Sequence, residues 1–340
     1  MELIVKTKSL LSQAEVEAIK STGSNLIFVS KYYPIIIVKS NNPSAFHHFS
    51  FVERIRLARI GKYSTEGNFL NNVIFRPMIQ ATLLKKNGYV GWGAKVAVLD
   101  SGLPLGLNVA KIMDFTGTGS TDRFGHGTFV TNIIKYYSQG AKLLIGKIGN
   151  DYPSEVFLIM ALEWAVDEGA DVINISSGFG SKCIGNCELG MLIDTIVNNT
   201  GIAIIVAAGN NGPHYNSIQC PACASNATSV GAIDVFGKLA SYSSRGRTCS
   251  RKPNILAPGD VIIDGKHANG TSYAAPIISG ILAATKNKHD NIQQAVQTMY
   301  DTAESLGLPF NEQGAGIFNL EKYLGVIEYG RSNSKGEGQN

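Results

Sequence analysis

Five strand-length runs of mainly apolar residues recur from residue 95 onward, and they limit the folds open to this chain. They lie at 95–99, 141–147, 171–175, 202–207 and 230–233. Because apolar residues fill successive rather than alternate positions, both faces of the sheet must be buried, which is typical of parallel strands. Segments 154–168 and 191–198 between them have helical patterns. This alternation predicts a three-layer α/β/α domain with a mainly parallel central sheet.

Composition sets the size of the core and the classes of partner. The chain has 340 residues, of which 44% are hydrophobic, enough for one large domain and a smaller one. Its net charge of +4 includes no basic block, so we expect no nucleic-acid partner. No apolar run approaches the roughly 20 residues that cross a bilayer, so we expect no membrane insertion.

Residues 1–60 read as a small α+β unit. Strands are predicted at 3–6, 26–29, 34–38 and 52–60, with helices at 12–21 and 43–49. Ser12 followed by Glu15 predicts a capping box at the start of the first helix. The order β-α-β-β-α-β, with both helices on one face, indicates a ferredoxin-like fold.

The remaining boundaries follow from composition. Residues 61–74 are polar and contain glycine, so we expect an exposed linker that is open to cleavage, followed by the large domain at 75–328 and a polar tail at 329–340. The first residues lack the basic and apolar regions of a signal peptide. We therefore expect a cytoplasmic protein, or a secreted one if a leader precedes this sequence.

Four polar residues stand at the ends of predicted elements. Asp100 ends a strand, His126 lies between two glycines before a helix, Asn210 follows a buried strand, and Ser272 begins a helix within the stretch 269–276. Strand ends of this kind line the sites of open α/β sheets. Taken singly, Asp100 could equally bind a ribose, a magnesium ion or nothing. A lone histidine is more often structural, an asparagine in a glycine-rich turn usually serves the turn, and a serine at a helix start could be a cap.

Together, the four motifs resemble those of the subtilisin-like serine proteases. They read Asp100-Ser-Gly, Gly125-His-Gly-Thr, Ala207-Ala-Gly-Asn and Gly270-Thr-Ser-Tyr-Ala-Ala-Pro. The resemblance extends over about residues 77–325 and includes the segments 172–178, 241–246, 257–259 and 314–319. Their order, Asp then His then Ser, is also that of this family.

The resemblance implies roles for these residues. Ser272 would attack a peptide carbonyl, His126 would transfer protons and Asp100 would orient the imidazole. Asn210 and the backbone N–H of Ser272 would stabilise the oxyanion. The segment Ser176, Ser177 and Gly178 would pair with an extended polypeptide substrate as an added strand.

The resemblance also implies that residues 1–60 are an N-terminal propeptide that inhibits the enzyme until cleavage within 61–74. It implies a monomer that needs no cofactor for catalysis. The short connection after 127–135 leaves out the loop that binds structural calcium in many relatives, so we expect that site to be absent. Neither 176–180 nor 216–223, which would form the walls of the specificity pocket, contains an acid, so we expect no preference for basic residues.

Five cysteines leave alternatives open. Cys183 and Cys187 form one close pair, Cys220 and Cys223 form another, and Cys249 stands apart. This spacing permits disulfides, a four-thiolate zinc site or free thiols. Zinc ribbons usually carry knuckle-like turns with glycine beside the second cysteine, and none is evident in the sequence.

Two other functions compete with proteolysis. The scaffold could hold peptides without cutting them, which predicts that Ser272→Ala preserves all function. A nucleotide-binding α/β protein would need a glycine-rich phosphate loop after a strand, and the sequence contains none.

Overall fold

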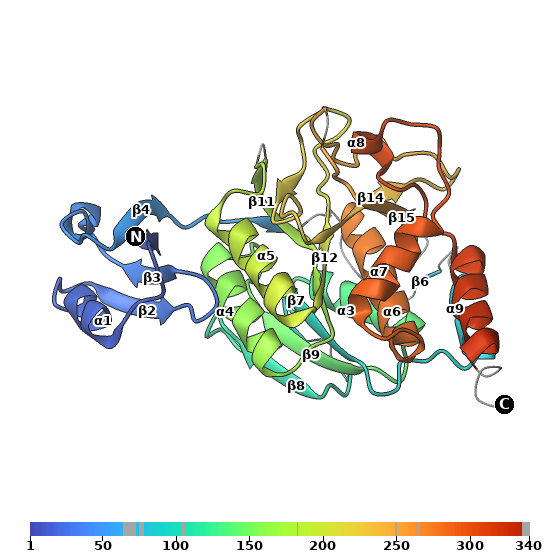
Figure 1. Cartoon of the computed structure of the whole chain (residues 1–340), viewed down its shortest axis with the longest axis horizontal. Coiled ribbons are helices and arrows are strands. Elements are labelled where there is room, and N and C mark those ends of the chain that lie inside the picture. The colour runs from blue at the N-terminus through green and yellow to red at the C-terminus, as the bar shows by residue number, and fades with distance from the viewer. Residues whose placement is uncertain are drawn as a thin grey trace.

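The large domain is built around a seven-stranded sheet in which every neighbouring pair of strands is parallel (Figure 1). The computed structural model describes residues 1–63, 73–74, 78–103, 106–181, 183–248, 250–263 and 266–334. The strand order is β15-β14-β12-β10-β7-β9-β8, with β7 Lys95–Asp100, β8 Lys111–Asp114, β9 Lys142–Lys147, β10 Val172–Ile175, β12 Ala203–Ala207, β14 Thr228–Ile233 and β15 Ile255–Pro258. The five predicted strands and the parallel sheet are confirmed.

Helices cover both faces of this sheet. One face packs against α2 (Met78–Lys86), α3 (His126–Tyr137), α6 (Thr271–Thr285), α7 (Ile292–Asp301) and α9 (Leu320–Ser334). The other face packs against α4 (Glu155–Asp167) and α5 (Glu188–Thr200). The remaining helical segments are η2 (Lys286–Lys288) and α8 (Phe310–Gln313). Two apolar clusters separated by the sheet therefore form the core, which confirms the three-layer prediction.

The N-terminal unit is a four-stranded antiparallel sheet of order β2-β3-β1-β4. Its elements are β1 Glu2–Thr7, α1 Gln13–Lys20, β2 Asn25–Val29, β3 Ile35–Lys39, the 3₁₀ helix η1 Pro43–Phe46 and β4 Val52–Leu57. The capping box is present, because the Ser12 hydroxyl accepts from the Glu15 N–H while the Glu15 carboxylate accepts from the Ser12 N–H at 2.8 Å. The second helix is shorter than predicted, and the fourth strand ends at Leu57.

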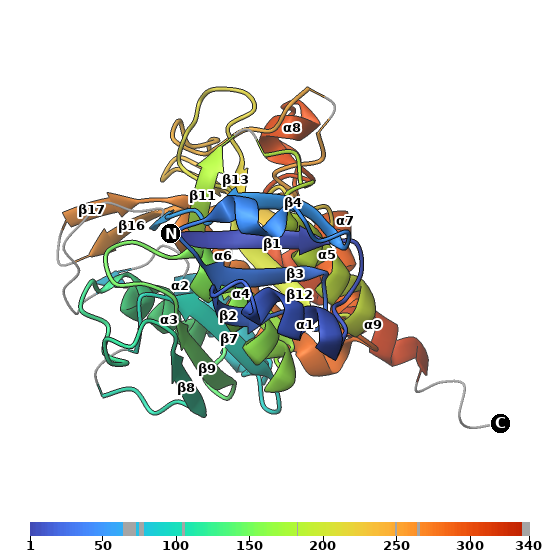
Figure 2. The same ribbon diagram turned by 90° about the vertical axis from the view of Figure 1, so that its left-hand side faces the viewer.

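The two central strands of the N-terminal sheet, β1 and β3, are buried on both faces, which explains the unbroken apolar run in β3. Ile36 and Val38 pack with Ile19 of α1 on the outer face, whereas Ile35 and Ile37 pack against α4 and α5 of the large domain. Figure 2 looks onto this sheet, with α4 and α5 behind it. The N-terminal unit thus uses one face for its own core and the other for docking.

Arginines at the end of the N-terminal unit bind carboxylates that are buried in the large domain. The Arg56 guanidinium donates to Glu155 at 2.8 and 2.9 Å and to Glu188 at 2.5 Å. Arg59 also donates to Glu155, at 3.0 Å through Nε. Burial alone would raise the pKa of Glu155, but hydrogen bonds from the two guanidinium groups hold that pKa below its usual value. Docking therefore favours the ionised carboxylate.

Two small sheets border the large domain. One has the order β13-β11-β5, with β5 Lys62–Tyr63, β11 Ser177–Ser181 and β13 Gln219–Cys220. The other has the order β17-β16-β6, with β6 Val73–Ile74, β16 Asp260–Ile263 and β17 Lys266–Asn269. Strand β5 lies in the predicted exposed linker, and that expectation is wrong for Gly61 and Tyr63, which are buried because they pack against β11. Residues 64–72 and 75–77 lie outside the described residues.

At the C-terminus, α9 continues through Ser334, into the residues predicted as a polar tail. Residues 335–340 lie outside the described part of the chain. Leu320, Tyr323, Leu324 and Ile327 of α9 are buried in the same cluster as α6, which the mixed composition of the segment did not indicate.

We predict that Arg56→Ala weakens docking of the N-terminal unit by about 1.5–3 kcal/mol, because it removes charged hydrogen bonds from two buried carboxylates, Glu155 and Glu188, and leaves them paired with Arg59 and Arg54. The matched control is Lys31→Ala, which removes an exposed ion pair to Asp167 across the same interface and should have little effect. Hydrogen exchange of β1 and β3 amides in the full chain measures both. Equal effects of the two substitutions would contradict the prediction.

The same contact predicts a pH dependence. Because the pKa of docked Glu155 is lowered, its contribution is present above the pKa of the undocked carboxyl and is lost as pH falls through the docked value. As the pH falls below about 4.5, the ordinary pKa of a glutamate, docking should therefore weaken more in the unmodified chain than in Arg56→Ala. Identical pH profiles for the two proteins would refute this role of Glu155.

Candidate active site

A buried carboxylate and a buried imidazole meet at the carboxyl edge of the central sheet. Asp100 is the last residue of β7, and His126 is the first residue of α3. The Asp100 Oδ1 atom lies 2.7 Å from His126 Nδ1 and also accepts the Ser101 N–H at 2.7 Å. Both side chains are fully buried. An imidazole held in this way through Nδ1 can accept a proton at Nε2.

Asp122 positions the loop that carries His126. Its carboxylate accepts the backbone N–H groups of Phe124, Gly125 and Thr128 at 3.1, 2.8 and 2.7 Å. The Ser101 hydroxyl donates to the same carboxylate at 2.9 Å and accepts the N–H of the residue after His126 at 2.8 Å. Asp122 was not predicted from the sequence, although an acid four residues before a helix start is a recognisable anchor for free N–H groups.

Two hydrogen bonds join Ser272, at the start of α6, to Ser176. The Ser272 hydroxyl donates to the Ser176 carbonyl at 2.8 Å, and the Ser176 hydroxyl donates to the Ser272 carbonyl at 3.3 Å. Pro276 makes the second bond possible, because it lacks the N–H that would otherwise bind the carbonyl four residues earlier. The helix start is thereby joined to the end of β10.

A second polar contact supports this junction from the core side. Asn174 of β10 donates to the Ser176 hydroxyl at 3.0 Å and accepts from Ser279 of α6 at 2.8 Å. All four side chains of this network are buried. Buried polar groups that are mutually satisfied specify one packing arrangement, so β10 and α6 have a defined register.

Asn210, which follows β12, also lies at the start of α6. Its side-chain oxygen accepts the backbone N–H and the hydroxyl of Thr271, both at 3.0 Å. The Gly209 N–H donates to the Thr271 hydroxyl at 3.1 Å. Because Thr271 holds the oxygen end of the amide, the NH₂ end is the one that can donate toward a ligand. Asn210 thus lies beside the N-terminus of α6, which also offers backbone N–H groups.

The chain's own segment β5 occupies the strand position beside β11. Tyr63 pairs with Ser177 and Lys62 with Gly178 in an antiparallel register. The Tyr63 ring lies on the imidazole of His126, with centroids 4.8 Å apart, and also stacks on Phe124 at 5.5 Å. No sequence signal identified Tyr63, because a single aromatic residue in a polar segment has no pattern.

Gln219 fills the space between the two glycines that border the site. A Cβ added at Gly178 would lie 2.6 Å from the Gln219 Oε1 atom, and one added at Gly209 would lie 2.5 Å from it. Gly178 belongs to β11, the strand that pairs with β5, and Gly209 directly precedes Asn210. A side chain reaching from an extended peptide toward Asn210 would therefore meet Gln219.

The four cysteines singled out in the sequence also converge. Their Sγ atoms all lie within 4.8 Å of one another, and no two of them are joined by a disulfide. Cys249 lies outside the described residues. The cluster is adjacent to the site, because Cys220 pairs with Phe179 of β11.

The site thus combines an imidazole–carboxylate pair, a serine at a helix N-terminus, an amide donor and a strand that binds extended peptide. This set can support nucleophilic attack on a carbonyl group with stabilisation of the resulting oxyanion.

Comparison with known proteins gives a consistent result. The profile of the subtilase family (Peptidase_S8) matches residues 91–316. Subtilisin DY of Bacillus licheniformis is 30% identical over 72% of this chain and 96% of its own length. Subtilisin amylosacchariticus of Bacillus subtilis subsp. amylosacchariticus is 31% identical over 72% of this chain and 68% of its own length.

Two further similarities differ in extent. The human membrane-bound transcription factor site-1 protease is 29% identical over 73% of this chain, which spans only 26% of that protein. A solved structure of a serine-to-alanine mutant of the protease domain of PatA superposes with a TM-score of 0.58 at 24% identity, covering 70% of this chain and 96% of that one. At this level of identity, the similarity to the PatA domain shows a shared fold alone.

We predict that Asn210→Ala lowers kcat for peptide hydrolysis about 10²–10³-fold with little change in KM, because an oxyanion donor acts mainly in the transition state. Asn211→Ala, at the exposed neighbouring position, is the control and should retain activity. Steady-state kinetics on a chromogenic peptide distinguish them. A proportional rise in KM with unchanged kcat would assign Asn210 to ground-state binding instead.

Proposed function

Because the chain belongs to the subtilase family and is a subtilisin-like serine endopeptidase, we propose that it cuts polypeptides with Asp100, His126 and Ser272 and is made as a self-processing zymogen. The observation that carries the proposal is the contact of the buried Asp100–His126 pair with Tyr63 of the chain's own N-terminal segment. An extended peptide thus lies beside the groups that would cut it.

In the proposed mechanism, Ser272 Oγ attacks the peptide carbonyl carbon while His126 Nε2 takes its proton. Asn210 and the Ser272 backbone N–H stabilise the oxyanion. The imidazolium, oriented by Asp100, then protonates the leaving amine and an acyl-enzyme remains. Water attacks this ester with His126 again as the base. Since these groups supply the nucleophile, the base and the oxyanion donors, we propose that catalysis needs no cofactor.

The N-terminal unit fits the role of an inhibitor. Its sheet docks on α4 and α5, its arginines bind Glu155, and β5 occupies the strand position on β11 where a substrate would pair. A tethered segment has a high effective concentration, so it excludes other peptides until it is cut and released. Substrates would bind by the same β-strand addition.

Tyr63 indicates where the first cut falls. His126 must reach both the attacking hydroxyl and the leaving amine, and the Tyr63 ring already lies against it. The carbonyl that is attacked therefore belongs to Tyr63 or to the residue that follows it. This narrows the cleavage region predicted at 61–74.

The test is intact mass after purification and storage. The unmodified chain should lose its N-terminus at one of the first two peptide bonds after Tyr63, whereas Ser272→Ala should remain whole. Ser225→Ala, which changes an exposed serine, is the matched control and should process normally. A fluorophosphonate should label the processed chain at Ser272.

The buried state of Tyr63 and His126 also favours a second candidate, a permanently inhibited protein that holds peptides. It predicts neither cleavage nor labelling in the full chain. To separate the two, the linker is cut with an added protease and the N-terminal unit is removed at acidic pH. Absence of labelling after this treatment would contradict the proposed function.

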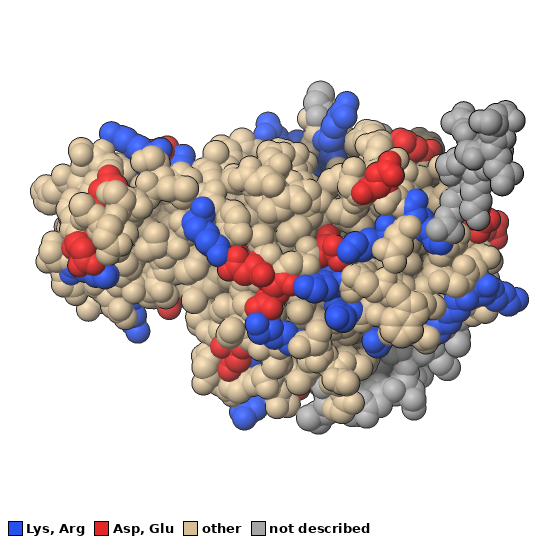
Figure 3. All heavy atoms as spheres, turned by 60° about the horizontal axis from the view of Figure 1, so that its bottom comes forward, with Lys and Arg blue, Asp and Glu red and all other residues tan. Residues whose placement is uncertain are grey.

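We propose a solitary monomer that has no nucleic-acid partner. Basic and acidic side chains are interspersed on the face in Figure 3, without a continuous basic surface. Among the described helices, none is both long and apolar enough to span a bilayer. The absence of the calcium loop remains a prediction from the sequence.

We predict that Gln219 limits the size of the side chain preceding the cut bond. Gln219→Ala should raise kcat/KM for large apolar residues at that position, relative to alanine, by about tenfold or more. Gln139→Ala, at an exposed glutamine, should leave the preference unchanged. A peptide series varied at that single position measures the ratio, and an unchanged ratio would place the pocket elsewhere.

A further inference from the structure

Two loops that are far apart in the sequence bring four thiols to one point. Cys183 and Cys187 lie before and at the N-terminus of α5, whereas Cys220 ends β13 and Cys223 follows in the next turn. Cys187 Sγ lies 3.4 Å from Cys183 Sγ and 3.1 Å from Cys220 Sγ. All four sulfur atoms are within 4.8 Å of one another.

These separations suit a single metal ion. Tetrahedral zinc with Zn–S bonds of about 2.3 Å holds its sulfur ligands about 3.8 Å apart, inside the range observed here. Disulfides join sulfurs in exclusive pairs, whereas Cys187 is close to two partners at once. A four-iron cluster needs more room among its ligands than this cluster leaves.

Backbone N–H groups of two glycines donate to two of the thiols, although neither glycine is directly beside the second cysteine of a pair. The Gly185 N–H donates to Cys183 Sγ at 3.4 Å, and the Gly190 N–H donates to Cys187 Sγ at 3.4 Å. Gly185 has φ of +90°, and a Cβ there would lie 2.6 Å from the Cys223 carbonyl oxygen. Glycine is therefore required both for the turn and for the close approach of the two loops.

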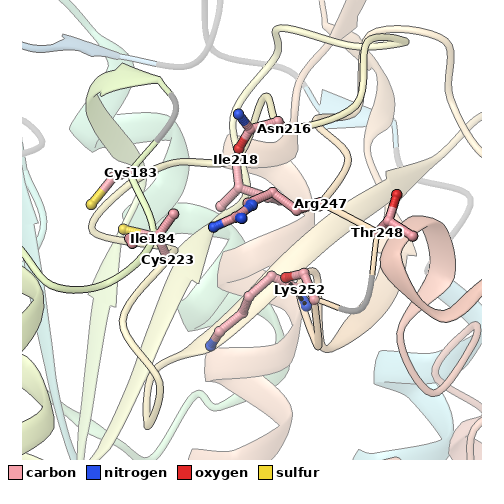
Figure 4. A pocket seen from close by; sticks show the side chains of 10 residues that line it. Cys183, Ile184, Asn216, Ile218, Cys223, Arg247, Thr248 and Lys252 are labelled. Carbon is pink, nitrogen blue, oxygen red and sulfur yellow. Dashed lines mark hydrogen bonds between the residues drawn. The ribbon is translucent and has the colours of Figure 1, made fainter.

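One guanidinium group lies beside two of the thiols, where it can balance part of the negative charge of a tetrathiolate site. Arg59 Nη2 lies 3.3 Å from Cys220 Sγ and 3.8 Å from Cys187 Sγ. The Cys187 sulfur also caps the N-terminus of α5, where it accepts the Gly190 N–H. Beside Cys183 and Cys223 is a cavity of about 330 Å³, and in Figure 4 the Arg247 guanidinium points toward these cysteines.

We propose that Cys183, Cys187, Cys220 and Cys223 bind one structural zinc ion. With four protein ligands the site is closed, so the metal would stabilise structure and would not take part in hydrolysis. It would tie α5 to β13, and through the Phe179–Cys220 pairing to β11, the strand that receives β5. Only this effect on peptide binding rests on the proposed function; metal content does not.

The experiment measures the metal in the full chain carrying Ser272→Ala, purified without chelator. We expect about one zinc ion per chain by elemental analysis. Cys187→Ser and Cys220→Ser, each added to this chain, should lose the zinc and lower Tm. Cys249→Ser is the matched control, because Cys249 is not among the four proposed ligands, and it should retain the full zinc content.

Titration with a mercurial reagent keeps the proposal testable if the serine variants fail to fold. In the Cys249→Ser background, about four equivalents should release one zinc, detected with a chromogenic chelator. Metal-free protein with two disulfides, lighter by about four hydrogen masses, would overturn the proposal. Four freely alkylated thiols without metal, or iron in place of zinc, would also overturn it. None of these results depends on whether Ser272 is a nucleophile.

Discussion

The burial of α6 is the constraint on which the site depends. All fifteen residues of this helix are buried, and it packs against α3 and several strands of the central sheet. A helix in such a position cannot shift without opening cavities in a close-packed core. Pro276 leaves one carbonyl free near its start, and Ser176 takes that bond. Ser272 is therefore held by the interior of the protein, even though it belongs to the site.

Packing between distant segments also positions β5, the segment of this chain that lies beside the site. Strand β5 completes the sheet on β11, and the arginines before it neutralise carboxylates that would otherwise be buried alone. Arg59 joins three regions, because it contacts Glu155, the thiol cluster and the Phe179 carbonyl. One side chain thus connects the docked N-terminal unit, strand β11 and the cysteine loops.

Elements that are buried along almost their whole length were predicted correctly from the sequence, whereas several partly exposed elements were missed. Strands β7, β9, β10, β12 and β14 are continuous apolar runs, so their pattern identified them. Strand β8 was missed because it lies at the sheet edge and is only half buried, and β15 was missed because Pro258 ends a short run. Helix α9 was missed because its apolar stripe is interrupted by charged residues. The 61–63 segment was assigned to an exposed linker because its polar composition does not reveal that β11 covers it.

The family, the layered sheet and the four motifs of Asp100, His126, Asn210 and Ser272 could be recognised from the sequence, because they depend on local motifs and on the period of apolar residues. The contact of Tyr63 with His126, the place of Gln219 between Gly178 and Gly209, and the convergence of four cysteines became visible only in the folded chain. Each of these contacts joins segments distant along the chain. Strand pairing and the docking of the two units create these contacts. Such contacts produce no repeating pattern of residue types from which they could be predicted.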